Sequence, residues 1–280
     1  MKYKITADSS SNMHHFDGVP YACVPLKIIT KENEYVDDES LDLERMVADL
    51  KAYKSTSGTS CPNVYEWMEA FGDAENVFAI AITSNLSGSC NAARQAADDY
   101  MKMYPGRKVC VLDSLSAGPE LRLIAEKVRE GILAGKEFEA IEAETREYMK
   151  HTHLLFTLQS LNNLARNGRV SPAVAKLAGV LGIVVVGKAS DVGTLQQMHK
   201  CRGEKRAIDT VYKEMKNHGY AGGRVRISHN MNVPAAEMLS GMIRAEYPDA
   251  DIAVEQSTAL CLFYAEEGGM LVGYEDGLDD

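Results

Sequence analysis

The chain has 280 residues, of which 45% are hydrophobic and 25% are charged, so it can bury a full core and is neither a disordered chain nor a small disulfide-stapled one. At roughly 100–200 residues per domain, this length predicts two domains or one large α/β domain. The 40 Asp and Glu residues outweigh the 30 Lys and Arg residues and give a net charge of −10, which disfavours nucleic acid as a partner.

The sequence predicts neither a membrane span nor a secretory signal. Its longest strongly apolar run, residues 177–187, has eleven residues, whereas a hydrocarbon core requires about 20. The first residues, MKYKITADSSSN, turn polar too early for the apolar region of a signal peptide. The six cysteines lie far apart without a C-x-x-C pair, so we expect reduced thiols. These features predict a cytoplasmic protein.

The first half alternates short apolar runs with amphipathic stretches, which is typical of a parallel sheet with crossover helices. Three apolar runs each end in a loop rich in Ser, Thr or Gly, and such loops follow the carboxyl ends of strands, where open α/β sheets bind ligands. The expected strands are residues 3–7, 77–82 and 108–112, and the expected helices are 41–53, 63–71, 91–103, 120–135 and 137–151.

The second half has a different pattern and predicts a smaller α+β domain with its sheet on one side and its helices on the other. Residues 154–170 are expected to form a helix with a basic end. After it come an extended pair, a helix, a strand, a helix and two strands, at residues 183–188 and 194–199, 204–218, 224–229, 234–247, 251–256 and 270–274. We therefore predict an N-terminal α/β domain at 1–159, an α+β domain at 160–280, and a ligand between them.

Several common enzyme signatures are missing from the chain. The sequence contains no G-x-S-x-G, no Walker A motif, no G-x-G-x-x-G and no H-E-x-x-H. Its two histidine clusters, His14 with His15 and His151 with His153, have no cysteine or carboxylate at a zinc-binding spacing. We assign no metal and no cofactor.

The clearest chemical signal is the density of hydroxyl groups in two loops. Residues 83–89 follow an expected strand and offer the hydroxyls of Ser84 and Ser87 beside the start of a helix, and residues 57–62 offer Thr59 before another helix. Neutral hydroxyls and amide N–H groups suit one carboxylate better than a polyphosphate, which favours arginine forks. The same residues would also serve as ordinary helix caps, and this alternative stays open.

Two further functions compete with anion binding. An enzyme could use Ser84 or Ser87 as a hydrolase nucleophile, or the chain could be a component of small-molecule phosphotransfer. The sequence places no base beside either serine, so binding ranks above covalent catalysis. The chain could also be a regulatory interaction protein whose partner binds a basic surface.

Taken in order, the motifs of the chain resemble those of the DegV family of bacterial fatty-acid-binding proteins, which includes the lipid-carrying subunit of fatty acid kinase. The matching segments span almost the whole chain and are Ala7-Asp8-Ser9, Val24-Pro25-Leu26, Tyr35-Val36-Asp37, Thr59-Ser60-Cys61-Pro62, residues 83–89, Asp113-Ser114, residues 161–170 and residues 202–207. The combination of T-S-x-P, L-S-G-S and a late N-G-R is more specific than any one of them.

The resemblance implies that this chain binds a long-chain fatty acid between its two domains. It also implies that the chain has no catalytic step of its own and presents the acid to a separate kinase. Burial of each CH₂ contributes about 0.8 kcal/mol, so the acyl chain would supply most of the affinity. From the resemblance and the hydroxyl pattern together, the predicted carboxylate-binding residues are Thr59, Ser84, Asn85, Ser87 and Tyr264.

Three basic or C-terminal positions complete the expected site. The family's glycine-arginine motif corresponds to Arg169 and its later basic motif to Arg202, so these cations are expected to orient the head group or to dock the kinase. Where the family commonly has H-x-G-x-G, this chain has Tyr264 followed by Ala-Glu-Glu-Gly. A tyrosine hydroxyl still donates to a carboxylate, whereas glutamates facing the pocket would disfavour an anion.

Overall fold

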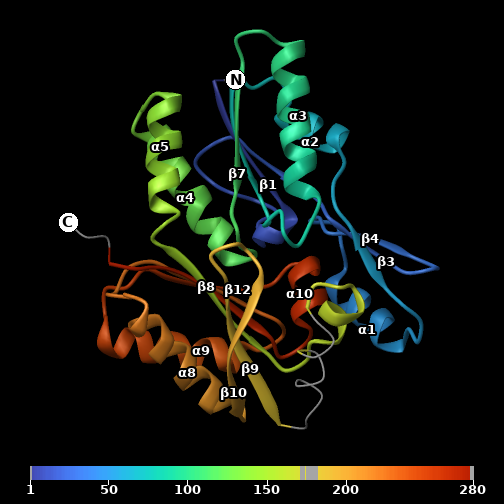
Figure 1. Cartoon of the computed structure of the whole chain (residues 1–280), viewed down its shortest axis with the longest axis vertical. Helices are drawn as coiled ribbons and strands as arrows, with labels where there is room; N and C mark the ends of the chain where they lie inside the picture. Colours follow the sequence, from blue (N-terminus) through green and yellow to red (C-terminus); the bar gives the residue numbers. More distant parts are fainter. Residues whose placement is uncertain (1, 171–173, 175–181, 278–280) are drawn as a thin grey trace.

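A four-stranded parallel sheet forms the core of the N-terminal half in the computed structural model, which describes residues 2–170, 174 and 182–277 (Figure 1). Its strands have the order β2-β1-β6-β7 and are β1 (Tyr3–Asp8), β2 (Tyr21–Val24), β6 (Asn76–Ala81) and β7 (Lys108–Asp113). A one-turn 3-10 helix, Ser9–Ser11, follows β1. This arrangement confirms the predicted parallel sheet.

Helices cover both faces of this sheet. Phe78 and Ile80 of β6 pack with α4 (Pro119–Leu133) and α5 (Phe138–Tyr148), while Val77 and Ala79 pack with α2 (Val64–Phe71) and α3 (Ser89–Met103) on the opposite face. Successive residues of a strand point to opposite faces, so a strand covered on both sides reads as one continuous apolar run.

A small antiparallel sheet lies beside the main one and has no counterpart in the sequence-based prediction. It has the order β4-β3-β5 and consists of β3 (Lys27–Ile29), β4 (Glu34–Val36) and β5 (Gly58–Ser60). Along the chain, helix α1 (Leu43–Ala52) lies between β4 and β5, and α2 follows β5. Ile28 and Met46 pack against Leu262 and Phe263 of α10 (Ala259–Ala265), which belongs to the C-terminal half. Figure 1 shows α10 next to β3 and α1.

The C-terminal half is built on a six-stranded sheet of order β10-β9-β8-β13-β11-β12. The strands are β8 (Thr152–Leu158), β9 (Ile183–Ala189), β10 (Leu195–Arg202), β11 (Val225–His229), β12 (Ile252–Gln256) and β13 (Met270–Glu275). Helices α8 (Glu204–Asn217) and α9 (Val233–Glu246) pack on one face. None of the helices in the described ranges is long and apolar enough to cross a membrane. Of the apolar run 177–187, residues 177–181 lie outside those ranges and residues 183–187 belong to β9.

The helix predicted over residues 154–170 is wrong. Residues 152–158 form β8, a strand hydrogen-bonded between β9 and β13, and only Asn162–Arg166 form a helix, α6. Leu155 packs into the core under α8, whereas Leu154 and Phe156 pack into a cluster on the other face. Because both faces are buried, the strand has no alternation of polar and apolar residues that would distinguish it from a buried helix.

The division of the chain after residue 159 stays a prediction. Since β8 is paired with β9 and β13, we propose that the C-terminal domain begins at β8, after α5. The other predicted strands and helices are present, with ends that differ by a few residues from the predicted ones.

Helix α4 makes buried polar contacts that join the two halves. Arg226 on β11 donates to both carboxylate oxygens of Glu126 on α4, at 2.8–3.1 Å, and to Asp251 at 2.8 Å. The hydroxyl of Thr152 on β8 donates to the carboxyl of Glu120, also on α4, at 2.8 Å. Burial raises the pKa of Glu120 to about 7, although the hydrogen bond from Thr152 acts to lower it.

Replacement of Arg226 by alanine is expected to cost about 3–5 kcal/mol of unfolding free energy, because the buried Glu126 carboxylate loses the three hydrogen bonds from Arg226 and keeps only the one from Arg122. Urea denaturation measures this loss. The control is Lys136→Ala, which breaks a half-exposed pair with Glu144 and should cost much less. An equal, small loss in both variants would show that the buried pair does not hold the halves together.

Glu120 should make stability depend on pH. Its pKa is raised on folding, so its favourable contribution is complete below about pH 4.5 and is lost as the pH rises through about 7. In the Glu120→Gln variant the side chain at this position cannot ionise. The unfolding free energy of the variant minus that of the original chain should therefore rise by about 2–3 kcal/mol between pH 5 and pH 8. Urea denaturation across this range checks the shift, and a constant difference between the two proteins would contradict it.

Candidate ligand cavity

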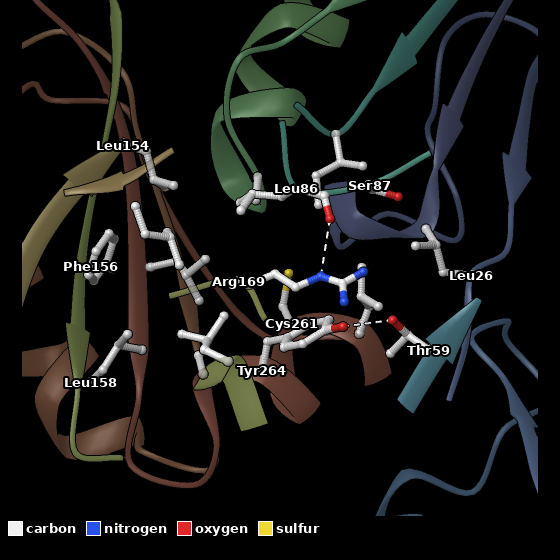
Figure 2. Close-up of a pocket in the computed structure, with 17 residues that line it drawn as sticks. Leu26, Thr59, Leu86, Ser87, Leu154, Phe156, Leu158, Arg169, Cys261 and Tyr264 are labelled. Atoms are coloured by element: carbon white, nitrogen blue, oxygen red, sulfur yellow. Dashed lines mark hydrogen bonds between the residues drawn. The ribbon is translucent and has the colours of Figure 1, made fainter. Parts of the chain in front are cut away.

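A cavity of about 80 Å³ lies between the two halves of the chain (Figure 2). The loops that follow β2, β6 and β7, strand β5 of the small sheet, β8, β13 and α10 all contribute to its wall. Its apolar wall residues are Leu26, Ile82, Leu86, Ala117, Leu154, Phe156, Leu158, Leu164, Leu195, Leu260, Cys261, Ala265 and Leu271. The described wall has four polar or charged residues, Thr59, Ser87, Arg169 and Tyr264. The cavity is therefore apolar over most of its surface.

Three of the polar side chains meet in one region of the cavity. The Thr59 Oγ1 and Tyr264 hydroxyl oxygens are 2.7 Å apart and share a hydrogen bond. Arg169 donates from Nε to the carbonyl of Leu86 at 3.2 Å, and its guanidinium carbon lies 5.8 Å from the centre of the Tyr264 ring. Figure 2 shows these side chains pointing toward one another. Two hydroxyls and a guanidinium together form a group of hydrogen-bond donors suited to one carboxylate.

Tyr264 reaches the cavity because α10 is held at its N-terminus by a buried carboxylate. The amides of Ala259 and Leu260 donate to the two oxygens of Asp37 at 2.9 and 3.0 Å, and the Thr258 hydroxyl donates to Asp37 at 3.2 Å. A carboxylate at this end of a helix satisfies amides that have no partner inside the helix. Asp37 follows β4, so this contact joins the small sheet to the helix that carries Tyr264.

Ser87 lines the cavity, whereas its neighbours Ser84 and Asn85 do not. The Ser84 amide donates to Asp113 at 3.1 Å, and the Asn85 side-chain amide donates to the carbonyl of Val192 at 2.6 Å. Both residues therefore fix the loop that carries Ser87, the first to the end of β7 and the second to the turn between β9 and β10.

The arginines predicted from the sequence lie in different places. Arg169 lines the cavity, but Arg202 lies exposed at the end of β10 and is not part of the wall. The two glutamates after Tyr264 also lie outside the wall. Glu266 accepts from the Ser160 hydroxyl at 2.7 Å and from the Asn163 amide at 3.1 Å, and Glu267 pairs with Lys51. Neither adds negative charge to the cavity wall.

The part of the cavity wall that the structure describes has no group that could activate a nucleophile for hydrolysis. None of the described wall residues is a histidine, aspartate, glutamate or lysine. The carboxylate nearest to Ser84 in the hydrogen-bond network is Asp113. Burial acts to raise its pKa, but hydrogen bonds from Ser84 and Leu115 and the charge of Arg94 leave that pKa below its ordinary value, which makes Asp113 a weak base.

The other reactive groups near the cavity also argue against catalysis. Burial raises the pKa of the Cys261 thiol far above its ordinary value, so the thiol stays protonated and is a poor nucleophile. Among the described residues, no cluster of His, Cys, Asp and Glu could hold a metal ion. The arrangement is suited to binding an apolar molecule with one anionic end.

The sequence analysis missed the apolar wall and the anchor of α10. Leu260 and Cys261 come from α10, a helix that was not predicted, and no local motif distinguishes them from ordinary core residues. Leu26 stands in a matching segment of the resemblance, but that segment gave no sign of a place in a cavity wall. Asp37 belongs to a segment that carried the family resemblance, but its role follows only from contact with residues more than two hundred positions away.

Comparison with known proteins agrees with this geometry. Residues 2–276 match the family described as "Uncharacterised protein, DegV family". A DegV domain-containing protein of Streptococcus pneumoniae is 39% identical over 98% of this chain and 99% of its own.

Two solved structures are similar over nearly their full length. One is a DegV family protein from Eubacterium eligens loaded with heptadecanoic acid, with a TM-score of 0.96 and 40% identity over 98% of this chain and 99% of that one. The other is the Fatty Acid Kinase (Fak) B3 protein of Streptococcus pneumoniae loaded with linoleic acid, with a TM-score of 0.97 and 39% identity over 99% of this chain and 100% of that one. The predicted fold class is confirmed, and the chain belongs to the DegV family.

Proposed function

We propose that this chain binds one long-chain fatty acid, with the acyl chain in the apolar part of the cavity and the carboxylate beside Thr59, Ser87, Arg169 and Tyr264. The observation that carries the proposal is the composition of the cavity, an apolar wall with hydroxyls and one guanidinium gathered in one region. Heptadecanoic and linoleic acids in two relatives of about 40% identity support the same ligand class.

The hydroxyl pair provides donors for the carboxylate. In the Thr59–Tyr264 hydrogen bond one hydroxyl donates and the other accepts. Hydroxyl hydrogens rotate at little cost, so both can turn toward a carboxylate that lies between them. Arg169 adds a charge-assisted hydrogen bond of about 1.5–3 kcal/mol. Ser84 and Asn85 contribute by holding the Ser87 loop in place.

The acyl chain would supply most of the binding free energy. Each buried methylene contributes about 0.8 kcal/mol, so a dozen or so of them outweigh the polar contacts. This division of affinity has a functional consequence. The carboxylate can be exposed to a second protein while the chain stays bound.

We further propose that the chain presents the fatty acid to a separate kinase and has no catalytic step of its own. The relative named as Fatty Acid Kinase B3 supports this role. The exposed Arg202 is the proposed docking residue, and the cytoplasm stays the predicted location. A hydrolase using Ser84 or Ser87 is not favoured, because the described wall contains no general base.

Displacement of a fluorescent fatty acid by hexadecanoic acid tests the site. The purified protein should bind one equivalent, and Arg169→Gln should weaken binding about tenfold or more, since it removes the cation from the carboxylate. The Thr59→Ala and Tyr264→Phe double variant should weaken it by a similar factor.

The matched control is Arg202→Gln, which removes the same charge outside the cavity and should leave the affinity for hexadecanoic acid within about twofold. Absence of binding in the unmodified protein would contradict the proposed ligand. Equal losses in Arg169→Gln and Arg202→Gln would contradict the proposed position of the carboxylate.

A further inference from the structure

A second and larger cavity, of about 530 Å³, adjoins the first. It lies where β8 begins, between the residues that follow β7, the end of α5 and the turn after β9. Its wall is partly polar and includes the buried Glu120 carboxyl, the Thr152 hydroxyl that donates to it, and Lys188. Of the residues that the structure describes, Leu154 alone belongs to the walls of both cavities.

The alternation of β8 places Leu154 at the boundary between a polar and an apolar region. Thr152, Leu154, Phe156 and Leu158 share one face of the strand, because they are two residues apart. Thr152 lines the second cavity only, whereas Phe156 and Leu158 line the first only. Along this face the wall therefore changes from polar to apolar at Leu154.

Two other chain segments cross the same boundary. Ala189 of β9 and Leu195 of β10 are cross-strand partners. Ala189 lines the larger, polar cavity, whereas Leu195 lines the smaller, apolar one. In the loop after β7, Leu115 lines the second cavity and Ala117 the first. The two cavities are therefore neighbours, separated by a thin layer of side chains to which Leu154 belongs.

The position of Leu154 is fixed by its surroundings. It is 3% exposed, and its cross-strand partner Gly273 has no side chain because the backbone of Pro119 and Glu120 packs against it. A Cβ on Gly273 would lie 2.7 Å from the amide nitrogen of Glu120. The first turn of α4 therefore packs directly against the sheet beside Leu154. Figure 2 shows Leu154 across the cavity from Thr59.

We propose that Leu154 determines the length of acyl chain that the protein accepts, by separating the apolar cavity from the polar one. The inference rests on the proposed fatty-acid function and adds a specificity-determining residue to it. A tail that ends before Leu154 contacts apolar side chains only. A longer tail has to displace Leu154 and enter the space beside Glu120, Thr152 and Lys188, where polar groups line the wall.

A series of saturated fatty acids from decanoic to docosanoic acid, each measured by displacement of a fluorescent fatty acid, tests the proposal. In the unmodified protein, affinity should rise about fourfold per added methylene up to a limiting length and then level off or fall. Leu154→Ala opens the partition and should move this limit to longer acids. Leu154→Phe should move it to shorter ones.

Leu155→Ala is the matched control. Leu155 is the next residue of β8, is buried to a similar degree, and lines the second cavity only. The Leu155→Ala variant loses the same atoms as Leu154→Ala, but from the opposite face of the sheet. The limiting acid length of Leu155→Ala should therefore equal that of the unmodified protein. Thermal denaturation of every variant shows whether it is folded. If Leu154→Ala does not fold, Leu154→Val and Leu154→Phe provide the comparison.

The outcomes separate the inference from the function on which it rests. If the unmodified protein binds none of the acids, the proposed function fails. If it binds them, but the folded Leu154 variants keep the original limit or Leu155→Ala moves it equally, Leu154 does not set the length and the inference is overturned.

Discussion

The contact between Asp37 and the first amides of α10 is the interaction on which the cavity depends. It joins a loop of the small N-terminal sheet to a helix more than two hundred residues later, and that helix carries Cys261 and Tyr264 into the wall. Asp37 is fully buried and accepts from two amides and a hydroxyl. This anchor helps to hold the Tyr264 hydroxyl 2.7 Å from Thr59.

Two kinds of contact have different roles in the proposed site. The apolar wall comes from many elements and provides affinity that grows with the length of the ligand. In the proposed complex the polar group is small and provides orientation, because Thr59, Arg169 and Tyr264 lie together in one region of the wall. A carrier needs this division, since the reactive end of its cargo has to stay available to a second protein.

The sequence allowed prediction of the parallel sheet because its strands are continuous apolar runs that end in hydroxyl-rich loops, as residues 76–81 show. The same property made β8 resemble a helix, since a strand buried on both faces has no period of two. The short strands β3, β4 and β5 have three residues each and leave too little pattern to detect.

Site residues could be predicted where their chemistry is local. Ser87 and Thr59 stand in hydroxyl-rich loops that were recognisable in the sequence, whereas Arg169 was predicted only from the family resemblance. Ser84 and Asn85 stand in the same loop as Ser87, yet their partners Asp113 and Val192 direct them away from the wall. Leu154 has no local signal at all, because its proposed role comes from its place between two cavities formed by distant segments.

The most direct test of the central claim is the ionisation of a bound fatty acid. Hexadecanoic acid labelled with carbon-13 at its carboxyl, titrated against pH in the complex, reports that ionisation by NMR. A carboxylate beside Arg169, Thr59 and Tyr264 should give one bound resonance. The pKa of the bound carboxyl group, read from the shift of this resonance with pH, should lie below that of the free acid, because the guanidinium and hydroxyls stabilise the charged form. A bound resonance that titrates like the free acid, or at a higher pH, would contradict the proposed site.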